Sequence, residues 1–311
     1  MTASWPRFLV SRALQLAALV VGAVSLLFIA LRLSGSPAAV LSGPNASPEV
    51  IHATTIRLGL DRSWGVQYLD FLRSGFRLDF GNSFASGTPA FSDAIHSLPS
   101  TLRIMVPGLV LIVVLGVAVG LAAALYPSRR WPRFLEASAF GLQALPFFWL
   151  GIVLVLLLAI DTQVLPATGN SGFSSTILPA IVLATPQIAA VARLLRGELL
   201  DALSEPYAVT ARSKGVSRRR LLLHHLAPNV LPTMISFLAV IFAFTLGAVV
   251  VVEPLFNYQG LGSLLVNGVQ ERDFPVVEAG VFLVAILVGL TNVLADVVSR
   301  LVAPEIGERA A

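Results

Sequence analysis

The 311-residue chain contains no cysteine and only one lysine, Lys214. The absence of cysteine excludes disulfides, thiolate nucleophiles and cysteine-ligated metals. Charged residues make up 12% of the chain, whereas 56% of its residues are hydrophobic and the mean hydropathy is +0.83. These values lie far outside the averages of soluble proteins, so the composition predicts an integral membrane protein.

The sequence also lacks the motifs on which common enzyme classes depend. It has no glycine-rich phosphate loop, no nucleophile elbow and no paired carboxylates within its apolar runs. His224 and His225 are adjacent and would point about 100° apart on a helix, whereas a helical zinc site uses an i, i+4 pair. His52 and His96 are isolated. We therefore expect no catalytic residue, no metal site and no ATP hydrolysis by this chain.

Six apolar runs are candidates for crossing a bilayer, which takes about 20 helical residues. Four are long enough, namely Ala13–Leu31, Ile104–Leu125, Ala137–Ile160 and Leu231–Val252. Ile177–Ala192 and Ala279–Ala295 are shorter, so that each is either a span or a buried or re-entrant helix. The composition and these runs predict an all-α, polytopic membrane protein.

The distribution of arginine indicates six spans. At the N-terminus and in the short loops, basic residues gather in three segments: Arg7 and Arg12; Arg129, Arg130 and Arg133; Arg193 and Arg196 with the residues after them. Segment 161–176 has no basic residue, and omitting the fourth span would export the most basic loop of the chain. Both termini are therefore expected in the cytoplasm. The first apolar run exceeds the usual core of a signal peptide, about 7–15 residues, and is expected to be an uncleaved anchor.

The long segment between the first two spans is predicted to lie outside the cell. Pro48–Leu60 and Gly65–Ser74 have the pattern of short amphipathic helices, and we expect them to form a small cap on the outer mouth of the bundle. The expected organisation is a first span at 1–33, the cap segment at 34–100, a five-helix core at 101–303 containing a basic loop at 193–230, and a cytoplasmic tail at 304–311.

The most distinctive polar segment is residues 205–228, called the elbow below. Ser204 and Pro206 predict the start of a short helix, Gly215 predicts its end, and Ser217 predicts the start of a second helix running to Leu226. Such a helix-turn-helix at the membrane surface suits the docking of a soluble partner. An ordinary positive-inside loop is the plain alternative. A DNA-binding helix-turn-helix is disfavoured because 193–230 is too short for an independent domain.

The interiors of the six runs carry no charged residue. Proton- or sodium-coupled transporters usually need buried ionisable groups, so their absence argues against that class. Pro146, Pro179 and Pro186 either free backbone carbonyls toward a cavity or produce simple packing kinks. Three glycines, Gly116, Gly120 and Gly151, are expected to permit close helix contact.

Several ordered motifs together resemble the permease subunits of binding-protein-dependent ABC importers for dipeptides, oligopeptides and nickel. The resemblance covers nearly the whole chain. Its motifs are Leu58-Gly-Leu-Asp-Arg, Gln67-Tyr-Leu, Leu98-Pro-Ser-Thr-Leu, Leu145-Pro-Phe-Phe-Trp-Leu-Gly, Leu165-Pro-Ala-Thr-Gly, Ile177-Leu-Pro-Ala, Tyr207-Ala-Val-Thr-Ala-Arg-Ser-Lys-Gly, Val252-Glu-Pro-Leu-Phe-Asn-Tyr-Gln-Gly-Leu-Gly and Ala303-Pro-Glu-Ile.

The resemblance implies the type I importer permease fold and a role for three groups of residues. The coupling loop that docks on the ATPase would comprise Tyr207, Thr210, Ala211, Arg212, Lys214, Gly215, Ser217, Arg218 and Arg219. Contacts with the binding protein, or an outer gate, would involve Leu58, Asp61, Arg62, Tyr68, Phe256, Asn257 and Gly260. The translocation path would involve Pro146, Phe147 and Pro186. The general importer pattern has Glu-Ala-Ala where this chain has Val209, Thr210 and Ala211, so a salt bridge from that glutamate is not expected.

The resemblance further implies a multi-pass protein of the bacterial inner membrane with several partners. These are a second homologous permease, two cytoplasmic ATPases, an extracytoplasmic substrate-binding protein and membrane lipid, with no nucleic acid. The chain itself would hold no cofactor, and ATP and Mg would bind in the partner subunits. A short peptide is the expected substrate, and nickel or another small solute is the alternative. A stand-alone channel would not need the elbow, and a membrane-embedded enzyme would need a catalytic constellation.

Overall fold

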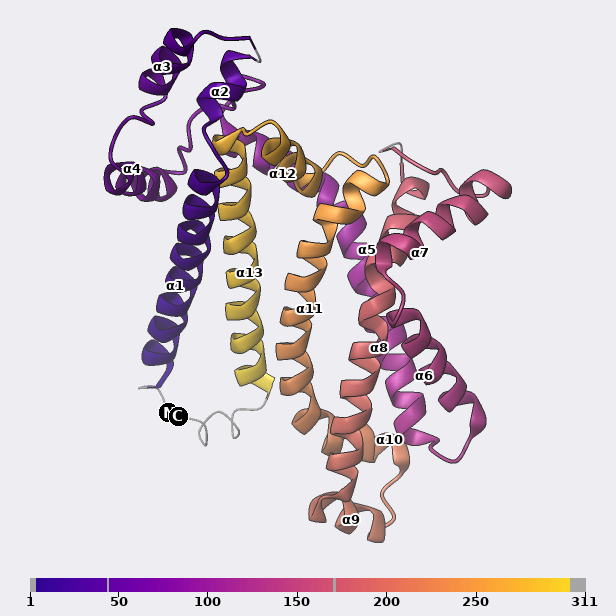
Figure 1. Cartoon of the computed structure of the whole chain (residues 1–311). Coiled ribbons are helices and arrows are strands. Elements are labelled where there is room, and N and C mark those ends of the chain that lie inside the picture. Colours follow the sequence, from indigo (N-terminus) through magenta and orange to yellow (C-terminus); the bar gives the residue numbers. More distant parts are fainter. Residues whose placement is uncertain (1–3, 44, 170–171, 303–311) are drawn as a thin grey trace. The chain divides into compact units, whose positions relative to one another are not determined.

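The computed structural model describes residues 4–43, 45–169 and 172–302 of the chain (Figure 1). Within these ranges the regular elements are helices, and the only strand-like pairing is an isolated bridge between Asn82 and Pro89. The all-α prediction is therefore confirmed. The chain divides into two compact units, Met1–Thr101 with Tyr258–Leu290, and Leu102–Asn257 with Thr291–Ala311. The predicted tail at 304–311 lies outside the described residues, as does the motif that begins at Ala303.

The first unit contains one long apolar helix and several short ones. Its helices are α1 (Ser4–Leu33), α2 (Pro37–Ser42), α3 (Pro48–Arg57), α4 (Trp64–Arg77), the start of α5 (Ala90–Leu125), α12 (Leu261–Gln270) and most of α13 (Phe274–Val302). Helices α3 and α4 match the two short helices predicted for the cap. Figure 1 shows α2, α3 and α4 gathered at one end of α1.

Aromatic rings form much of the core of this first unit. Phe80 lies 5.1 Å from Phe282 and 6.3 Å from Phe71, measured between ring centroids, and Phe71 stacks on Phe28 at 5.8 Å. The Tyr68 hydroxyl forms a hydrogen bond with Ser25 Oγ at 2.7 Å. These contacts fix α4 against α1 and α13, so the cap is an ordered part of the unit.

The second unit holds the remaining helices. They are the rest of α5, α6 (Arg130–Gln143), α7 (Phe147–Leu154), the π-helix η1 (Val155–Asp161), α8 (Ser174–Ser204), α9 (Pro206–Ser213), α10 (Arg218–Arg220), the π-helix η2 (Leu221–Leu226), α11 (Ala227–Leu255) and the end of α13. Figure 1 shows α9 and α10 at the end of α8 that is remote from α7.

Small residues bring α5 close to α8. A Cβ atom on Gly120 would lie 2.7 Å from the carbonyl oxygen of Ala192, and one on Gly116 would lie 2.7 Å from Val191 Cγ1. Similarly, a Cβ on Gly151 of α7 would lie 2.6 Å from Leu255 Cδ2. The prediction that these glycines permit close helix contact is confirmed: a larger residue at Gly116 or Gly120 would press on Val191 or on the backbone of α8, and one at Gly151 would have to displace the end of the Leu255 side chain.

The third apolar run, Ala137–Ile160, was expected to be a single span and is broken in the structure. Helix α6 ends at Gln143, and α7 begins at Phe147 after a bend of 100°. Pro146 is the N-cap residue of α7. Because proline lacks a backbone N–H and disfavours helical geometry in the residue before it, the chain ends one helix and starts another there.

Five helices are long and apolar enough to cross a membrane, or six if the bent pair α6 and α7–η1 counts as one span. The two runs that seemed short lie within long helices, Ser174–Ser204 and Phe274–Val302. Polar and charged residues at the helix ends hid this length from the hydropathy pattern. Arg193 and Arg196, expected in a loop, belong to α8 and contact α6, with Arg196 Nη1 2.8 Å from Glu136 Oε1.

Candidate functional site

The first helix of the elbow is α9, and it begins one residue later than predicted. Helix α8 continues to Ser204, whose hydroxyl donates to the carbonyl of Asp201 at 2.7 Å. Glu205 therefore takes the N-cap position in extended conformation, and Pro206 is the first helical residue. Proline suits this position because the N–H it lacks would have no partner within the helix.

Gly215 ends α9, as predicted. Its φ angle is +75°, a left-handed conformation, and its N–H donates to the carbonyl of Arg212 at 3.0 Å. The N–H of Val216 donates to the carbonyl of Ala211 at 3.1 Å. A glycine just past the end of a helix is typical because it has no Cβ to penalise this geometry.

The second helix of the elbow does not stop at Leu226. It begins after Ser217 as α10 and continues through η2 into α11, so that Arg218–Leu255 forms one long helix. Leu221 and Leu226 are buried and help hold the π-helical segment in place. Pro228 lies inside this continuous helix, just after the π-helical segment, and its missing N–H removes one backbone hydrogen bond there. The basic residues of α10 are thus directly continuous with a candidate membrane span.

One face of α9 is buried and the rest is exposed. Ala208 and Ala211, three residues apart, are buried within the hydrophobic core of the second unit. Their small side chains let α9 lie close to that core. The other predicted coupling residues are exposed: Tyr207, Thr210, Arg212, Lys214, Gly215, Ser217, Arg218 and Arg219.

Two of the exposed arginines bind the ends of neighbouring helices. Arg212 Nη2 donates to the carbonyl oxygen of Leu203, near the end of α8, at 2.6 Å. Arg218 donates to the carbonyl oxygen of Leu125, the last residue of α5, and its guanidinium lies 4.6 Å from the centre of the Tyr126 ring. Carbonyls at a helix C-terminus lack intrahelical partners, so a cation is favourable there. Sequence reasoning gave these arginines only a docking role.

Tyr207 provides a further link. Asn229 Nδ2 donates to its hydroxyl oxygen at 3.2 Å and to the carbonyl of His225 at 2.9 Å. Burial raises the pKa of Tyr207, so its hydroxyl remains neutral at physiological pH. Tyr207, Arg212 and Arg218 therefore connect the elbow to α11, α8 and α5, respectively.

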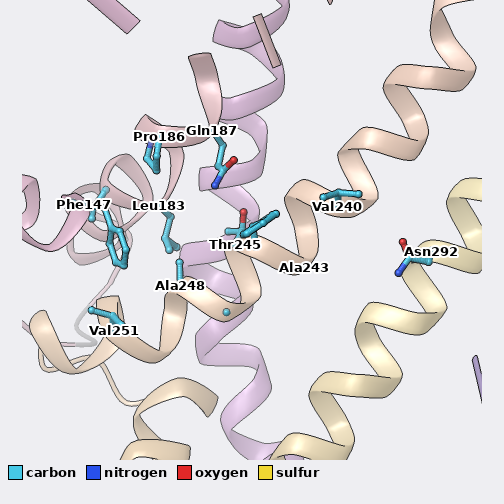
Figure 2. Close-up of a pocket in the computed structure, with 13 residues that line it drawn as sticks. Phe147, Leu183, Pro186, Gln187, Val240, Ala243, Thr245, Ala248, Val251 and Asn292 are labelled. Carbon is cyan, nitrogen blue, oxygen red and sulfur yellow. The ribbon is translucent and has the colours of Figure 1, made fainter. Parts of the chain in front are cut away.

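The second unit also contains a cavity of about 620 Å³. Figure 2 shows Gln187 of α8 and Asn292 of α13 with their amide groups directed toward α11. The lining residues are Phe147, Val182, Leu183, Pro186, Gln187, Val240, Ala243, Phe244, Thr245, Gly247, Ala248, Val251 and Asn292. None of these residues is charged, and most of the wall is apolar.

Of the residues expected along a translocation path, Phe147 and Pro186 line this cavity. Pro146 starts α7 and is not among the lining residues. Sequence reasoning missed Gln187, Gly247 and Asn292. Gln187 and Asn292 are isolated amides within apolar runs, and that isolation was the signal available in the sequence.

The residues expected to contact a binding protein fall in both compact units. Leu58, Asp61, Arg62 and Tyr68 belong to the first unit with Gly260, whereas Phe256 and Asn257 belong to the second. Asp61, Arg62 and Asn257 are exposed, but Phe256 is only 2% exposed. The Phe256 carbonyl accepts a hydrogen bond from the N–H of Gly169 at 3.2 Å, which fits a packing position.

The expectation of uncharged spans holds for the apolar runs but not for the full helices. In the first unit, Arg32 of α1 lies 3.8 Å from Glu278 of α13 and donates to Gln67 Oε1 at 2.7 Å. Glu253, near the end of α11, is fully buried. These charged residues lie within one or two turns of a helix end. The apolar runs stop short of them, so the hydropathy pattern predicted spans that are shorter than the helices. Among the described residues no group of three or more His, Asp or Glu is arranged to hold a metal.

Comparison with known proteins adds an independent line of support. Residues 116–308 match the family model described as "Binding-protein-dependent transport system inner membrane component". The glutathione transport system permease protein GsiC of Salmonella typhimurium is 34% identical over 290 residues, covering 93% of this chain and 94% of the relative. A probable peptide ABC transporter permease protein, y4tP of Sinorhizobium fredii, is 34% identical, covering 90% of this chain and 92% of the relative.

Proposed function

We propose, from the premise that this chain belongs to the family of binding-protein-dependent transport system inner membrane components, that it forms half of the path for short peptides in an ATP-driven importer. Family membership makes the chain a multi-pass inner-membrane permease. The peptide substrate is supported by the relatives, whose names specify glutathione or peptides.

The observation that carries this proposal is the elbow. Its exposed surface holds Thr210, Lys214 and Arg219, while Tyr207, Arg212 and Arg218 connect it to three helices. A soluble ATPase that grips the exposed surface would therefore pull on α5, α8 and α11 together. A stand-alone channel works without an ATPase and would not need this connection between the elbow and three helices.

In this proposal the chain works with a second homologous permease, two cytoplasmic ATPases and an extracytoplasmic binding protein. ATP and Mg bind in the ATPases, and this chain supplies no catalytic residue. The elbow and both termini face the cytoplasm, whereas the cap helices α3 and α4 face the binding protein. ATP binding closes the ATPase pair, and the elbow transmits that closure to the helices that line the cavity.

Reconstitution tests the function directly. The intact complex in liposomes should accumulate trialanine or glutathione only when ATP and the loaded binding protein are both present. Nickel serves as the alternative solute under the same conditions. ATP-dependent uptake of nickel without uptake of peptide would show that the substrate is a metal ion. Equilibration of peptide across the membrane without ATP would indicate a facilitator.

A further inference from the structure

We propose that the cavity of the second unit recognises the main chain of a peptide through the neutral amides of Gln187 and Asn292, with Gly247 setting the size that it admits. This proposal rests on the peptide-importer function above and deepens it. It assigns substrate contacts to residues on α8, α11 and α13.

The side-chain amides of Gln187 and Asn292 have donors and acceptors that no group in the described part of the chain occupies. Gln187 and Asn292 are partly exposed to the cavity, and neither forms a hydrogen bond within the described part of the chain. The third polar side chain of the wall, Thr245, already donates its hydroxyl to the carbonyl of Ile241 at 2.8 Å. Each amide carries both donors and an acceptor, which matches the alternating N–H and C=O groups of a peptide.

Pro186 interrupts the backbone hydrogen bonding of α8 beside the same wall. In a regular helix the carbonyl of Val182 accepts from the N–H of residue 186, but proline has no N–H. Val182 and Pro186 both line the cavity, next to Gln187. The proline thus leaves the carbonyl of Val182, a fully buried residue, without its usual helical partner.

The absence of charge from the wall favours passage over tight binding. A charged side chain in a water-poor cavity would attract one sign of substrate strongly, whereas conduction requires binding weak enough for release. Exposed apolar residues such as Phe244 and Val251 can instead contact peptide side chains of varied shape. The cavity volume of about 620 Å³ falls in the usual range for small-molecule sites, roughly 300–1,000 Å³.

Gly247 lies in the middle of the α11 stripe that lines the cavity. Val240, Ala243, Gly247 and Val251 are spaced by three or four residues and so share one face of the helix. A Cβ atom added at Gly247 would meet nothing within 4 Å, so a side chain at this position would begin in open space. A larger side chain at Gly247 should therefore reduce the volume of the cavity while the packing of α11 is kept.

The size test compares Gly247→Leu with Gly247→Ala in the reconstituted complex, using dialanine, trialanine and pentaalanine. Leucine should lower trialanine and pentaalanine uptake by about tenfold while dialanine uptake falls less. Alanine should leave all three within about twofold of wild type. Binding-protein-stimulated ATP hydrolysis should persist in both variants, which separates a narrowed path from a damaged complex.

The contact test substitutes the amides. Gln187→Leu and Asn292→Leu should each lower trialanine uptake, and Gln187→Asn should recover part of it because an amide remains. Gln187→Glu should shift the ratio of Ala-Lys-Ala to Ala-Asp-Ala uptake by about tenfold toward the lysine peptide. Dividing variant by wild-type uptake for each peptide removes the preference of the unchanged binding protein.

Two results would overturn the inference while leaving the importer function intact: wild-type uptake of every peptide by Gly247→Leu, or an unchanged charge ratio in Gln187→Glu together with full uptake by both leucine variants. Failure of the wild-type complex to take up any of the peptides would instead refute the proposed function.

Discussion

Arg212 donates a hydrogen bond from Nη2 to the carbonyl oxygen of Leu203 across the short connection between α8 and α9. A residue that sequence reasoning placed on a docking surface thus holds the elbow against the end of α8. Removing the side chain should loosen the elbow as well as change its charge.

The first prediction compares two arginines of the elbow. Arg212→Ala loses the bond to Leu203, and a hydrogen bond to a charged group is worth about 1.5–3 kcal/mol, less at an exposed site. Arg219→Ala removes the same charge from an exposed side chain that has no partner within the described residues. We expect Arg212→Ala to impair peptide uptake more than Arg219→Ala, while ATPase co-purification falls to a similar extent. Equal uptake in the two variants would show that only charge matters here.

The second prediction concerns Gly215, whose φ angle is +75°. A β-branched residue at this φ costs about 1–2 kcal/mol or more, so Gly215→Val should distort the turn and block uptake. Gly215→Asn is the matched control because asparagine tolerates left-handed geometry better than other residues. Both proteins should insert in the membrane in normal amounts, as judged by immunoblotting of membrane fractions. Normal transport by the valine variant would mean that the turn has no role in coupling.

The third prediction concerns Tyr207, which accepts a hydrogen bond from Asn229 Nδ2. Tyr207→Phe keeps the ring but removes this bond, at a cost of about 0.5–1.5 kcal/mol. Binding-protein-stimulated ATP hydrolysis should continue, and the number of peptides imported per ATP should fall. A stoichiometry equal to that of wild type would exclude a coupling role for the hydroxyl.

The fourth prediction tests the cap through Gln67. This buried side chain accepts from Arg32 Nε at 2.7 Å and donates to the carbonyl of Arg62 at 2.8 Å. Gln67→Leu removes these bonds and a third one to the carbonyl of Leu60, and it leaves the half-buried Arg32 guanidinium less satisfied, at a cost of roughly 1–3 kcal/mol. We expect ATPase subunits to co-purify normally while stimulation by the loaded binding protein falls. The exposed Leu69→Ala is the control on α4, and full stimulation in Gln67→Leu would show that the cap does not transmit docking.

The fifth prediction concerns topology and uses the absence of native cysteine, which makes any introduced thiol unique. Ser86, Ser128 and Ser217 are all exposed in the chain. Cysteine at Ser86 should react with an impermeant reagent in intact cells, whereas cysteine at Ser128 or Ser217 should react only after the membrane is opened. Labelling at Ser217 from outside would invert the proposed orientation of the elbow.

The sequence predicted the helical class, the cap helices and the turn at Gly215 because each depends on local chemistry. Apolar composition, amphipathic spacing and a glycine after a helix act within a few residues of chain. It named Pro146 as a residue able to bend a helix but did not predict the 100° break there, and it ended the elbow's second helix too early. Tertiary packing and a continuing apolar face decide whether a helix stops.

The contacts between residues that are distant in the sequence could not be predicted from the sequence. Arg218 and Leu125 are 93 residues apart, and Gln187 and Asn292 lie on different helices. Nothing in a single sequence states which distant carbonyl an arginine will meet. An amide isolated in an apolar run does indicate a functional position, since an unpartnered polar group is costly within a membrane.

The helix from Arg218 to Leu255 is continuous from the elbow to the cavity. With 38 residues and a rise of about 1.5 Å per residue, this rod is roughly 57 Å long. Its basic end lies in the elbow, and Gly247 lies near the opposite end. In the proposed mechanism, a tilt of about 3° at the basic end would move Gly247, about 44 Å away, by about 2 Å, and a small rearrangement in a docked ATPase would thus reach the cavity stripe.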